Sequence, residues 1–249
     1  MKALVTGASS GIGRDIARYL KEKGYELILV SKTESKLKNI SKELDSKYIV
    51  CDLRNKEEVY SLYEKVKNEN INVLVNNAGF GLFGVFDETP LDRELEMIEV
   101  NAVAPHILTK LFLKDFIKKD SGYILNVASS AGFLSGPKLS TYYATKNYIL
   151  KLTLAISEEL RRKKSRVHIS ALCPGPVDTN FNKVAGGEFH TKSLSSEFVA
   201  RYAIDKMFKN KLIIIPGFSM KVAMFFQRFL PTKLALRITY NIQDKKNVK

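Results

Sequence analysis

The sequence of 249 residues lacks several features that would mark a specialised class of protein. Its two cysteines, Cys51 and Cys173, lie far apart and each ends a short apolar run. We expect free, buried thiols of the kind found in a reducing compartment, and no disulfide framework. The three histidines form no cluster with cysteine or acidic residues at metal-ligand spacing. No metal site is therefore predicted.

Long apolar runs are also missing. The longest, such as residues 212–215 and 222–226, fall far short of the ~20 residues that a transmembrane helix needs. Met1 and Lys2 are soon followed by Thr6 and Gly7, so a signal peptide is not predicted either. Because 45% of the residues are hydrophobic and 27% are charged, the composition excludes low-complexity disorder. We expect a folded cytoplasmic protein.

Negative charge is in deficit, since 40 Lys and Arg residues face 26 Asp and Glu residues, for a net charge of +14. Residues 201–249 hold 11 of the basic and 2 of the acidic residues, which places +9 in the last fifth of the chain. This basic end suits a solvated lysine-rich surface, an anionic membrane or an acidic partner. Nucleic-acid binding is not predicted, because no recognised nucleic-acid-binding motif accompanies the basic residues.

The period of the apolar residues alternates along the chain between that of strands and that of helices. Short, continuously apolar strands, typical of strands covered on both faces, are expected at residues 3–5, 27–30, 48–51, 73–75, 123–127, 167–172 and 212–215. Helices are expected at residues 11–23, 34–44, 57–66, 91–117 (continuous, or interrupted at Pro105), 141–160 and 197–208. This alternation predicts an α/β fold with a doubly wound, seven-stranded parallel sheet and helices on both faces.

No linker or internal repeat divides the pattern, so we predict a single domain over residues 1–249. Its core comprises residues 1–215, and residues 216–249 form a basic, apolar tail. In the tail, residues 218–230 fit an amphipathic helix. For residues 234–242, strand-like alternation and helical spacing fit equally well.

Glycines gather directly after the first expected strand, where residues 6–13 read TGASSGIG. Glycines at these positions allow a tight turn and a close approach of the backbone to a ligand. The helix that follows directs its N-terminal N–H groups at an anion such as a pyrophosphate. This predicts a Rossmann-type dinucleotide site, although the spacing G-x3-G-x-G differs from the usual G-x-G-x-x-G. The residues of the predicted loop are Gly7, Ser9, Ser10, Gly11, Ile12 and Gly13.

Further motifs occur in a familiar order. Residues 76–79 read NNAG after the fourth strand, Asn101 lies in the long helix, and Ser129 lies at the end of the fifth strand. The sequence Tyr142-x-x-x-Lys146 follows Ser129, and Pro174-Gly175 follows the sixth strand. With TGASSGIG, this series resembles the short-chain dehydrogenase/reductase family over roughly residues 1–215. The resemblance implies an oxidoreductase that transfers a hydride between a nicotinamide cofactor and a carbonyl or secondary alcohol substrate.

The resemblance also implies where the cofactor is held. Asp52 and Leu53 would flank the adenine, although Asp52 also suits the N-cap of the next helix. Ala78 and Gly79 would form a floor of small residues under the adenine ribose, and Thr179 would reach the nicotinamide amide. The other residues expected by resemblance at the cofactor are Asn77, Tyr142, Lys146, Pro174, Gly175 and Val177.

Cofactor choice depends on the end of the second strand, which meets the adenosine ribose in such folds. Neither Ser31 nor Lys32 is acidic, and Lys32 can pair with a 2′-phosphate while Ser31 hydrogen-bonds it. This favours NADP(H) over NAD(H). Two residues weaken the argument: Glu34 lies nearby, and Ser10 stands where many NADP-using relatives have a basic residue.

The proposed catalytic group is Ser129, Tyr142 and Lys146, with Asn101. Tyr142 and Lys146 are four residues apart, so they share one face of a helix. An adjacent ammonium and an oxidised nicotinamide both favour the phenolate, and we expect them to lower the pKa of Tyr142. Tyr142 would then exchange a proton with the substrate oxygen as general acid or base, and Ser129 would hydrogen-bond that oxygen. By resemblance, Lys146 holds the nicotinamide ribose and Asn101 shapes the long helix and completes a proton path.

The substrate is expected at the carboxyl ends of the strands. Residues 180–195, which include His190, resemble a mobile lid. A hydrophobic pocket is also expected and indicates an apolar ketone. The expected members of this pocket are Phe80, Phe83, Phe133, Leu134 and Phe181. The tail either closes this cleft, packs against a partner subunit, lies on an anionic membrane, or is partly disordered after Asp244. Relatives form dimers or tetramers through the helices that hold Asn101 and Tyr142, so we expect the same. An alternative function is a dinucleotide sensor or scaffold without turnover, or a membrane-associated reductase of lipid or steroid ketones.

Overall fold

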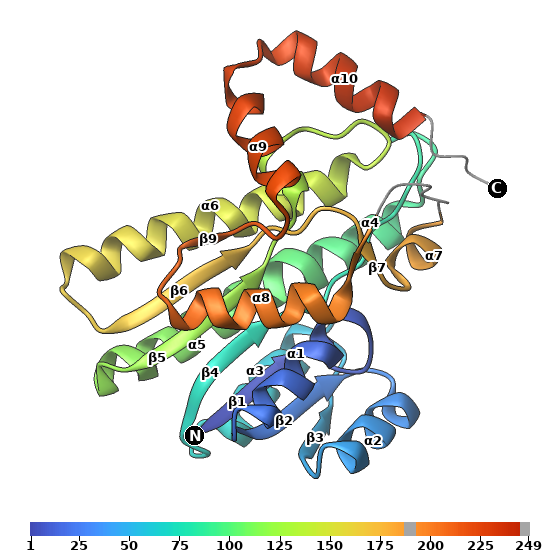
Figure 1. Ribbon diagram of the computed structural model, residues 1–249. Helices are drawn as coiled ribbons and strands as arrows, with labels where there is room; N and C mark the ends of the chain where they lie inside the picture. Colours follow the sequence, from blue (N-terminus) through green and yellow to red (C-terminus); the bar gives the residue numbers. More distant parts are fainter. Residues whose placement is uncertain (187–192, 245–249) are drawn as a thin grey trace.

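A computed structural model of the chain describes residues 1–186 and 193–244. Seven parallel strands form its central sheet in the order β3-β2-β1-β4-β5-β6-β9 (Figure 1). Their bounds are β1 (Lys2–Thr6), β2 (Glu26–Ser31), β3 (Lys47–Val50), β4 (Ile71–Asn76), β5 (Gly122–Val127), β6 (Val167–Leu172) and β9 (Ile213–Ile214). The strand order reverses direction next to β1, so the loops after β1 and β4 open a crevice at the carboxyl ends.

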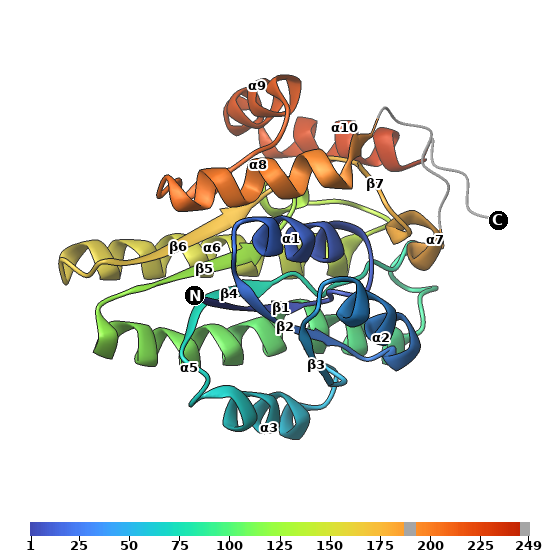
Figure 2. The ribbon, with the colours of Figure 1, turned by 60° about the horizontal axis from the view of Figure 1, so that its bottom comes forward.

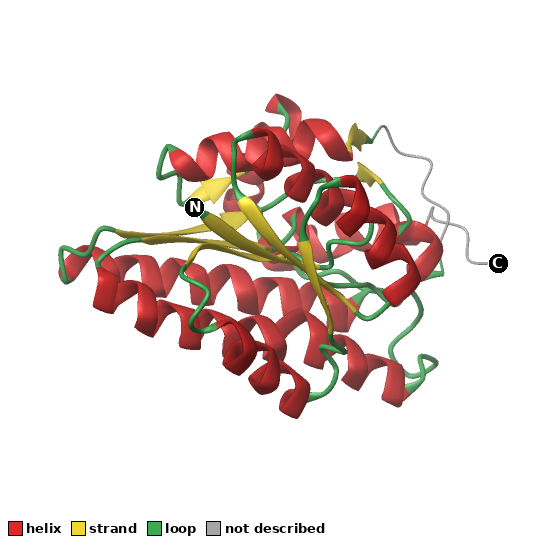
Figure 3. Ribbon diagram, turned by 90° about the horizontal axis from the view of Figure 1, so that it is seen from below, coloured by secondary structure: helices red, strands yellow, loops and turns green. Residues whose placement is uncertain are grey.

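Helices cover both faces of the sheet, because side chains alternate between the faces along each strand. Ala3 and Val5 pack into one apolar cluster, whereas Leu4 packs into the cluster on the opposite face. The first cluster includes α1 (Gly11–Glu22), α2 (Glu34–Glu43) and α8 (Ser196–Phe208), and the second includes α3 (Lys56–Val66), α5 (Ala104–Lys119) and α6 (Ser140–Arg162). Figures 2 and 3 show the sheet between these two layers. The predicted α/β fold is confirmed.

The long helix expected over residues 91–117 is interrupted by a wider turn. It consists of α4 (Leu91–Ile98), a π-helical turn η1 (Glu99–Val103) and α5. Pro105 lies in the first turn of α5, where a missing N–H costs least. The wide turn therefore precedes Pro105, and it contains Asn101.

The structure adds short elements that the apolar pattern does not indicate. They are η2 (Ser130–Phe133), α7 (Phe181–Ala185) and a separate parallel pair formed by β7 (Val177–Asp178) and β8 (Leu194–Ser195). In the tail, α9 (Phe218–Phe226) and η3 (Gln227–Phe229) agree with the predicted amphipathic helix. The ambiguous segment is helical, as α10 (Thr232–Asp244). None of the helices in the described ranges has the length and apolar character needed to cross a membrane.

The N-cap expected at Asp52 lies elsewhere. Asn55 caps α3, since its side-chain oxygen accepts hydrogen bonds from the backbone N–H groups of Glu57 and Glu58. Asp52 instead binds the guanidinium of Arg54, at 2.5 Å. The prediction was wrong because α3 begins three residues later than a cap at Asp52 requires.

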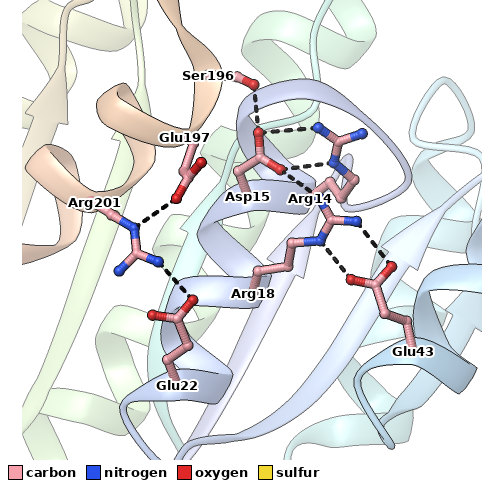
Figure 4. A network of polar contacts seen from close by, with 8 residues as sticks. All are labelled: Arg14, Asp15, Arg18, Glu22, Glu43, Ser196, Glu197 and Arg201. Carbon is pink, nitrogen blue, oxygen red and sulfur yellow. Dashed lines mark hydrogen bonds and ion pairs between the residues drawn. The ribbon is translucent and has the colours of Figure 1, made fainter.

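A polar network joins α1 to α2 and α8 (Figure 4). Asp15 is buried on α1 and binds Arg14, Arg18 and the hydroxyl of Ser196. Burial alone would raise the pKa of this carboxyl, but hydrogen bonds from Arg14 and Ser196 and the nearby positive charges hold it below its usual value. The network fixes α1, and with it the glycine loop, against α8.

Candidate active site

A cavity of about 500 Å³ lies at the carboxyl ends of the strands. It extends from the loops after β1 and β2 to the start of α6. The predicted residues that line it are Gly7, Ser9, Ser10, Gly11, Ile12, Ser31, Lys32, Asp52, Leu53, Asn77, Ala78, Gly79, Ser129, Tyr142, Lys146, Pro174, Gly175, Val177 and Thr179. Gly13 and Asn101 do not line the cavity and lie behind its wall. The fold thus brings together segments that are spread over most of the sequence.

The glycine loop has the backbone geometry that its sequence predicts. Gly7 and Gly11 have φ of +64° and +54°, a region that favours glycine. A Cβ atom on Gly13 would lie 2.2 Å from Nδ2 of Asn77 and 2.4 Å from the carbonyl oxygen of Gly7. Ser10 precedes α1 without capping it through its side chain, which leaves the helix N-terminus available to an anion. The loop and α1 therefore form a cradle that fits a pyrophosphate.

The far end of the cavity, after β2, is basic. The hydroxyl of Ser31 lies 2.9 Å from that of Ser9, and Lys32 is exposed beside it. Lys36 also lines the cavity, which the sequence analysis missed. Its place in the first turn of the expected helix that follows Lys32 was the available signal, because the start of that helix lies beside the end of β2.

Tyr142 lies on the first turn of α6, with its ring facing Phe181 at a centroid distance of 5.2 Å. Burial of the phenol raises its pKa to about 12, although a hydrogen bond with Ser129 acts in the opposite direction. Ser129 is fixed in turn, because its Oγ accepts a hydrogen bond of 3.1 Å from the backbone of Ala131. In the protein alone, Tyr142 is therefore a neutral proton donor at physiological pH.

Lys146 lies one turn further along α6 and is buried. Its Nζ donates a hydrogen bond of 2.9 Å to the carbonyl oxygen of Val127, and it lies 5.8 Å from the centre of the Tyr142 ring. Burial lowers the pKa of the ammonium to about 8. In the protein alone, desolvation of the phenol dominates the pKa of Tyr142, and the lowering expected from Lys146 together with an oxidised nicotinamide stays a prediction.

Asn101 positions the loop between the cofactor cradle and Tyr142. Its side chain accepts from the backbone N–H of Phe80 at 3.0 Å and donates to the carbonyl oxygen of Phe80 at 2.8 Å. It also contacts the hydroxyl of Thr145 on α6. A Cβ atom on Gly79 would lie 2.9 Å from Oδ1 of Asn101 and 3.3 Å from Nζ of Lys146, so these three residues meet. Asn101 therefore ties the loop after β4 to α6.

The substrate side of the cavity differs in part from the prediction. Phe80 and Phe181 line it, but Phe83 is buried in the protein and Phe133 and Leu134 lie outside the lining. Val184 and Leu139 complete the apolar wall instead. Part of the predicted lid, with His190, lies outside the described residues.

The tail contributes a polar residue to this wall. Gln243, at the end of α10, is 1% exposed and donates a hydrogen bond of 2.7 Å to the hydroxyl of Tyr143. Its Oε1 atom is buried and has no hydrogen-bond partner among the described residues. Met220 of α9 covers Gly175, where a Cβ atom would lie 2.4 Å from its methyl group. Two residues of the tail thus lie at the cavity, and cleft closure by the tail stays a prediction.

Comparison with known sequences agrees with this geometry. A relative from Staphylococcus saprophyticus, an uncharacterized oxidoreductase, is 36% identical over 185 residues, which are 71% of this chain and 78% of that protein. A very-long-chain 3-oxoacyl-CoA reductase of Phaeosphaeria nodorum is 34% identical over 194 residues, 73% of this chain. The chain spans about half of that longer relative, 56% of its length.

Solved structures share the fold. A short-chain dehydrogenase from Sphingobium yanoikuyae in complex with NADPH has a TM-score of 0.83 at 24% identity, covering 92% of this chain and 93% of that one. A short chain dehydrogenase/reductase from Burkholderia phymatum in complex with NAD has a TM-score of 0.83 at 22% identity, covering 100% and 96%. The sequence model of the short chain dehydrogenase family matches residues 1–188. The chain belongs to the short chain dehydrogenase family of oxidoreductases.

Proposed function

We propose that the protein is an NADP(H)-dependent reductase of ketones, or the reverse alcohol dehydrogenase, with Tyr142 as the general acid or base. The observation that carries this proposal is the placement of Tyr142, Lys146 and Ser129 in the same cavity as the glycine cradle. The nicotinamide, when bound, would supply or accept the hydride. The chain itself binds, orients and handles the proton.

The side chains divide these tasks. Ser129 is oriented by the hydrogen bond that its oxygen accepts from Ala131. Its hydroxyl hydrogen, which is directed at Tyr142 in the protein alone, would turn to the substrate oxygen as charge develops there. Tyr142 is protonated at neutral pH and gives that proton to the same oxygen during reduction. Lys146 presents a buried ammonium to the nicotinamide ribose, and Asn101 holds the loop that carries Gly79 beside it.

The preference for NADP(H) rests on charge. Lys32 and Lys36 both line the adenosine end of the cavity, and the acid in its lining, Asp52, is paired with Arg54. The ammonium groups of Lys32 and Lys36 together suit a 2′-phosphate. Glu34, the residue that weakened the sequence argument, is bound to Lys38 at 2.9 Å.

The hydride-transfer proposal is tested by initial rates on a panel of ketones (steroid, aliphatic, diketone and acetoacetyl thioester) with NADPH and NADH in parallel. We expect turnover with a preference for NADPH. Tight NADPH binding without turnover on any of them would contradict the proposal and favour the sensor function. The very-long-chain 3-oxoacyl-CoA relative makes the thioester an informative member of the panel.

The substrate side supports an apolar ketone that carries a second polar group. Phe80, Phe181 and Val184 form an apolar wall, and Gln243 lines the same cavity with an Oε1 atom that is buried and has no hydrogen-bond partner among the described residues. A buried acceptor without a partner is costly, so a substrate hydroxyl or amide N–H that reaches it gains affinity.

Replacing Gln243 by Leu tests this second contact. For substrates with a hydroxyl or amide, we expect KM to rise about tenfold while kcat changes little, because such a hydrogen bond is worth about 1.5 kcal/mol. For simple ketones without that group, KM should change by no more than about twofold. An equal rise in KM for both kinds of substrate would mean that Gln243 serves only to hold α10 in place.

The low pKa of Lys146 predicts a pH dependence of cofactor binding. Ribose hydroxyls that accept from the ammonium stabilise the charged form, so the protonated protein binds NADPH more tightly. The Kd for NADPH should be constant below about pH 7 and rise about tenfold as the pH passes through the Lys146 pKa of about 8. Cofactor fluorescence titrations measure it. In Lys146→Met, the Kd for NADPH should be higher and should not change with pH over this range. A Kd that still rises with pH in this variant would mean that another group titrates.

A further inference from the structure

The outer side of the tail is an exposed apolar surface. We call it the tail surface, formed by the exposed side chains Phe218, Lys221, Val222, Phe225, Phe226, Arg228, Phe229, Leu230, Lys233, Leu234, Arg237 and Ile238. No residue of α9 is buried, although six of its nine side chains are Phe, Met or Val. Phe218 is 81% exposed and Phe229 is 66% exposed. Figure 1 shows α9 and α10 projecting beyond the rest of the molecule.

The tail surface carries positive charge only. Its cations are Lys221, Arg228, Lys233 and Arg237, and residues 218–243 contain no Asp or Glu. Asp244, which follows, is bound to Lys138. The Arg228 guanidinium lies over the rings of Phe225 and Phe229, at 4.0 and 5.0 Å from their centroids. Exposed aromatic and aliphatic groups interleaved with cations are the pattern of a segment that lies in the plane of a lipid interface.

We propose that the tail surface binds the anionic surface of a lipid bilayer. Apolar side chains would enter the boundary between headgroups and acyl chains, and the four cations would contact anionic headgroups. A second copy of the chain fits less well. A two-fold dimer through this surface would set the same four cations against each other, in a protein whose net charge is already +14.

The inner side of α10 fixes this surface relative to the cleft. Thr239 and Gln243 are buried against the protein, and Gln243 lines the substrate side of the cavity. One helix therefore borders the cavity and presents the surface that would meet the lipid. This arrangement suits an apolar substrate that partitions into membranes.

Vesicle binding by the full-length protein tests the proposal without any need for turnover. We expect co-sedimentation with vesicles of equal parts phosphatidylglycerol and phosphatidylcholine at low salt, and much weaker binding to phosphatidylcholine alone. Lys233→Gln with Arg237→Gln should reduce partitioning by about fivefold for each cation. The matched control, Lys42→Gln with Lys65→Gln, removes the same charge from exposed residues of α2 and α3 and should reduce it less than twofold or so.

A second pair of variants separates apolar insertion from charge. Phe226→Ser should lower partitioning about tenfold, whereas Tyr60→Ser, an exposed aromatic residue on α3, should leave it unchanged. Circular dichroism checks that both variants stay folded. The proposal is overturned if the protein binds equally to phosphatidylglycerol-containing vesicles and to phosphatidylcholine vesicles, or if Phe226→Ser does not alter the binding. So does a dimer in sedimentation that Phe226→Ser dissociates, since a second copy would then cover the surface.

Discussion

Replacing Tyr142 by Phe should lower kcat for ketone reduction by about a thousandfold, because the variant removes the group that gives a proton to the substrate oxygen. The ring remains, so the packing against Phe181 and the shape of the cavity are kept. The Kd for NADPH should change less than about threefold, since the phenol hydroxyl is a minor part of the cofactor surface. Steady-state rates and cofactor titrations on the same preparation give both values.

The matched control is Tyr148→Phe, on the same helix. Its hydroxyl bonds to His106 at 2.7 Å on the surface, away from the cavity. We expect kcat within about twofold of the unmodified protein. A Tyr142→Phe variant that retains more than a tenth or so of kcat would refute the role of Tyr142 as general acid. Solvent water would then have to supply the proton.

Changing Ser31 to Asp should reverse the cofactor preference. A carboxylate at the end of β2 accepts from the 2′-hydroxyl of NADH and repels the 2′-phosphate of NADPH. The ratio of kcat/KM for NADPH to that for NADH should fall about a hundredfold, since such a like-charge contact costs several kcal/mol. Ser31 is buried against Ser9, so the hydrogen bond to that hydroxyl can be kept by the new carboxylate.

Lys36→Ala refines the same test. It should weaken NADPH binding about tenfold and leave NADH binding unchanged, as expected for loss of one phosphate contact. Lys42→Ala, on the same helix but outside the cavity, is the control and should change neither. A parallel loss for both cofactors in Lys36→Ala would mean that Lys36 contacts a part that NADH and NADPH share.

The sequence predicts the sheet well because its strands are buried on both faces. Their apolar runs leave few alternatives, and the loops after them carry the motifs. The secondary structure of residues 234–242 was ambiguous, because alternating and helical periods both fit them. The structure shows a helix, in which Thr239 and Gln243 are the buried side chains. Gln243 itself was missed for a similar reason, since its partner Tyr143 lies 100 residues away.

The substrate pocket was predicted less well. Phe83 and Phe133 lie close in sequence to site residues, but the direction of each side chain depends on loop geometry that apolar periodicity does not encode. Phe83 is 7% exposed and packs inside the protein instead. The spacing of Tyr142 and Lys146 predicts that they lie close together, but it does not predict the desolvation that raises the pKa of the phenol in the protein alone.

The π-helical turn η1 has a consequence for how this gene can vary. A π turn holds one residue more than an α-helical turn, and each residue of an α-helix advances it by about 100°. Deleting any one codon between those for Glu99 and Val103 would let the segment close into an uninterrupted α-helix. Because the π turn takes up its extra residue locally, α4 and α5 would keep their orientation, and Met97 would stay buried. The side chain of Asn101 would lose its hydrogen bonds to the backbone of Phe80. The extra residue in η1 thus serves the placement of Asn101 rather than the continuity of the helix.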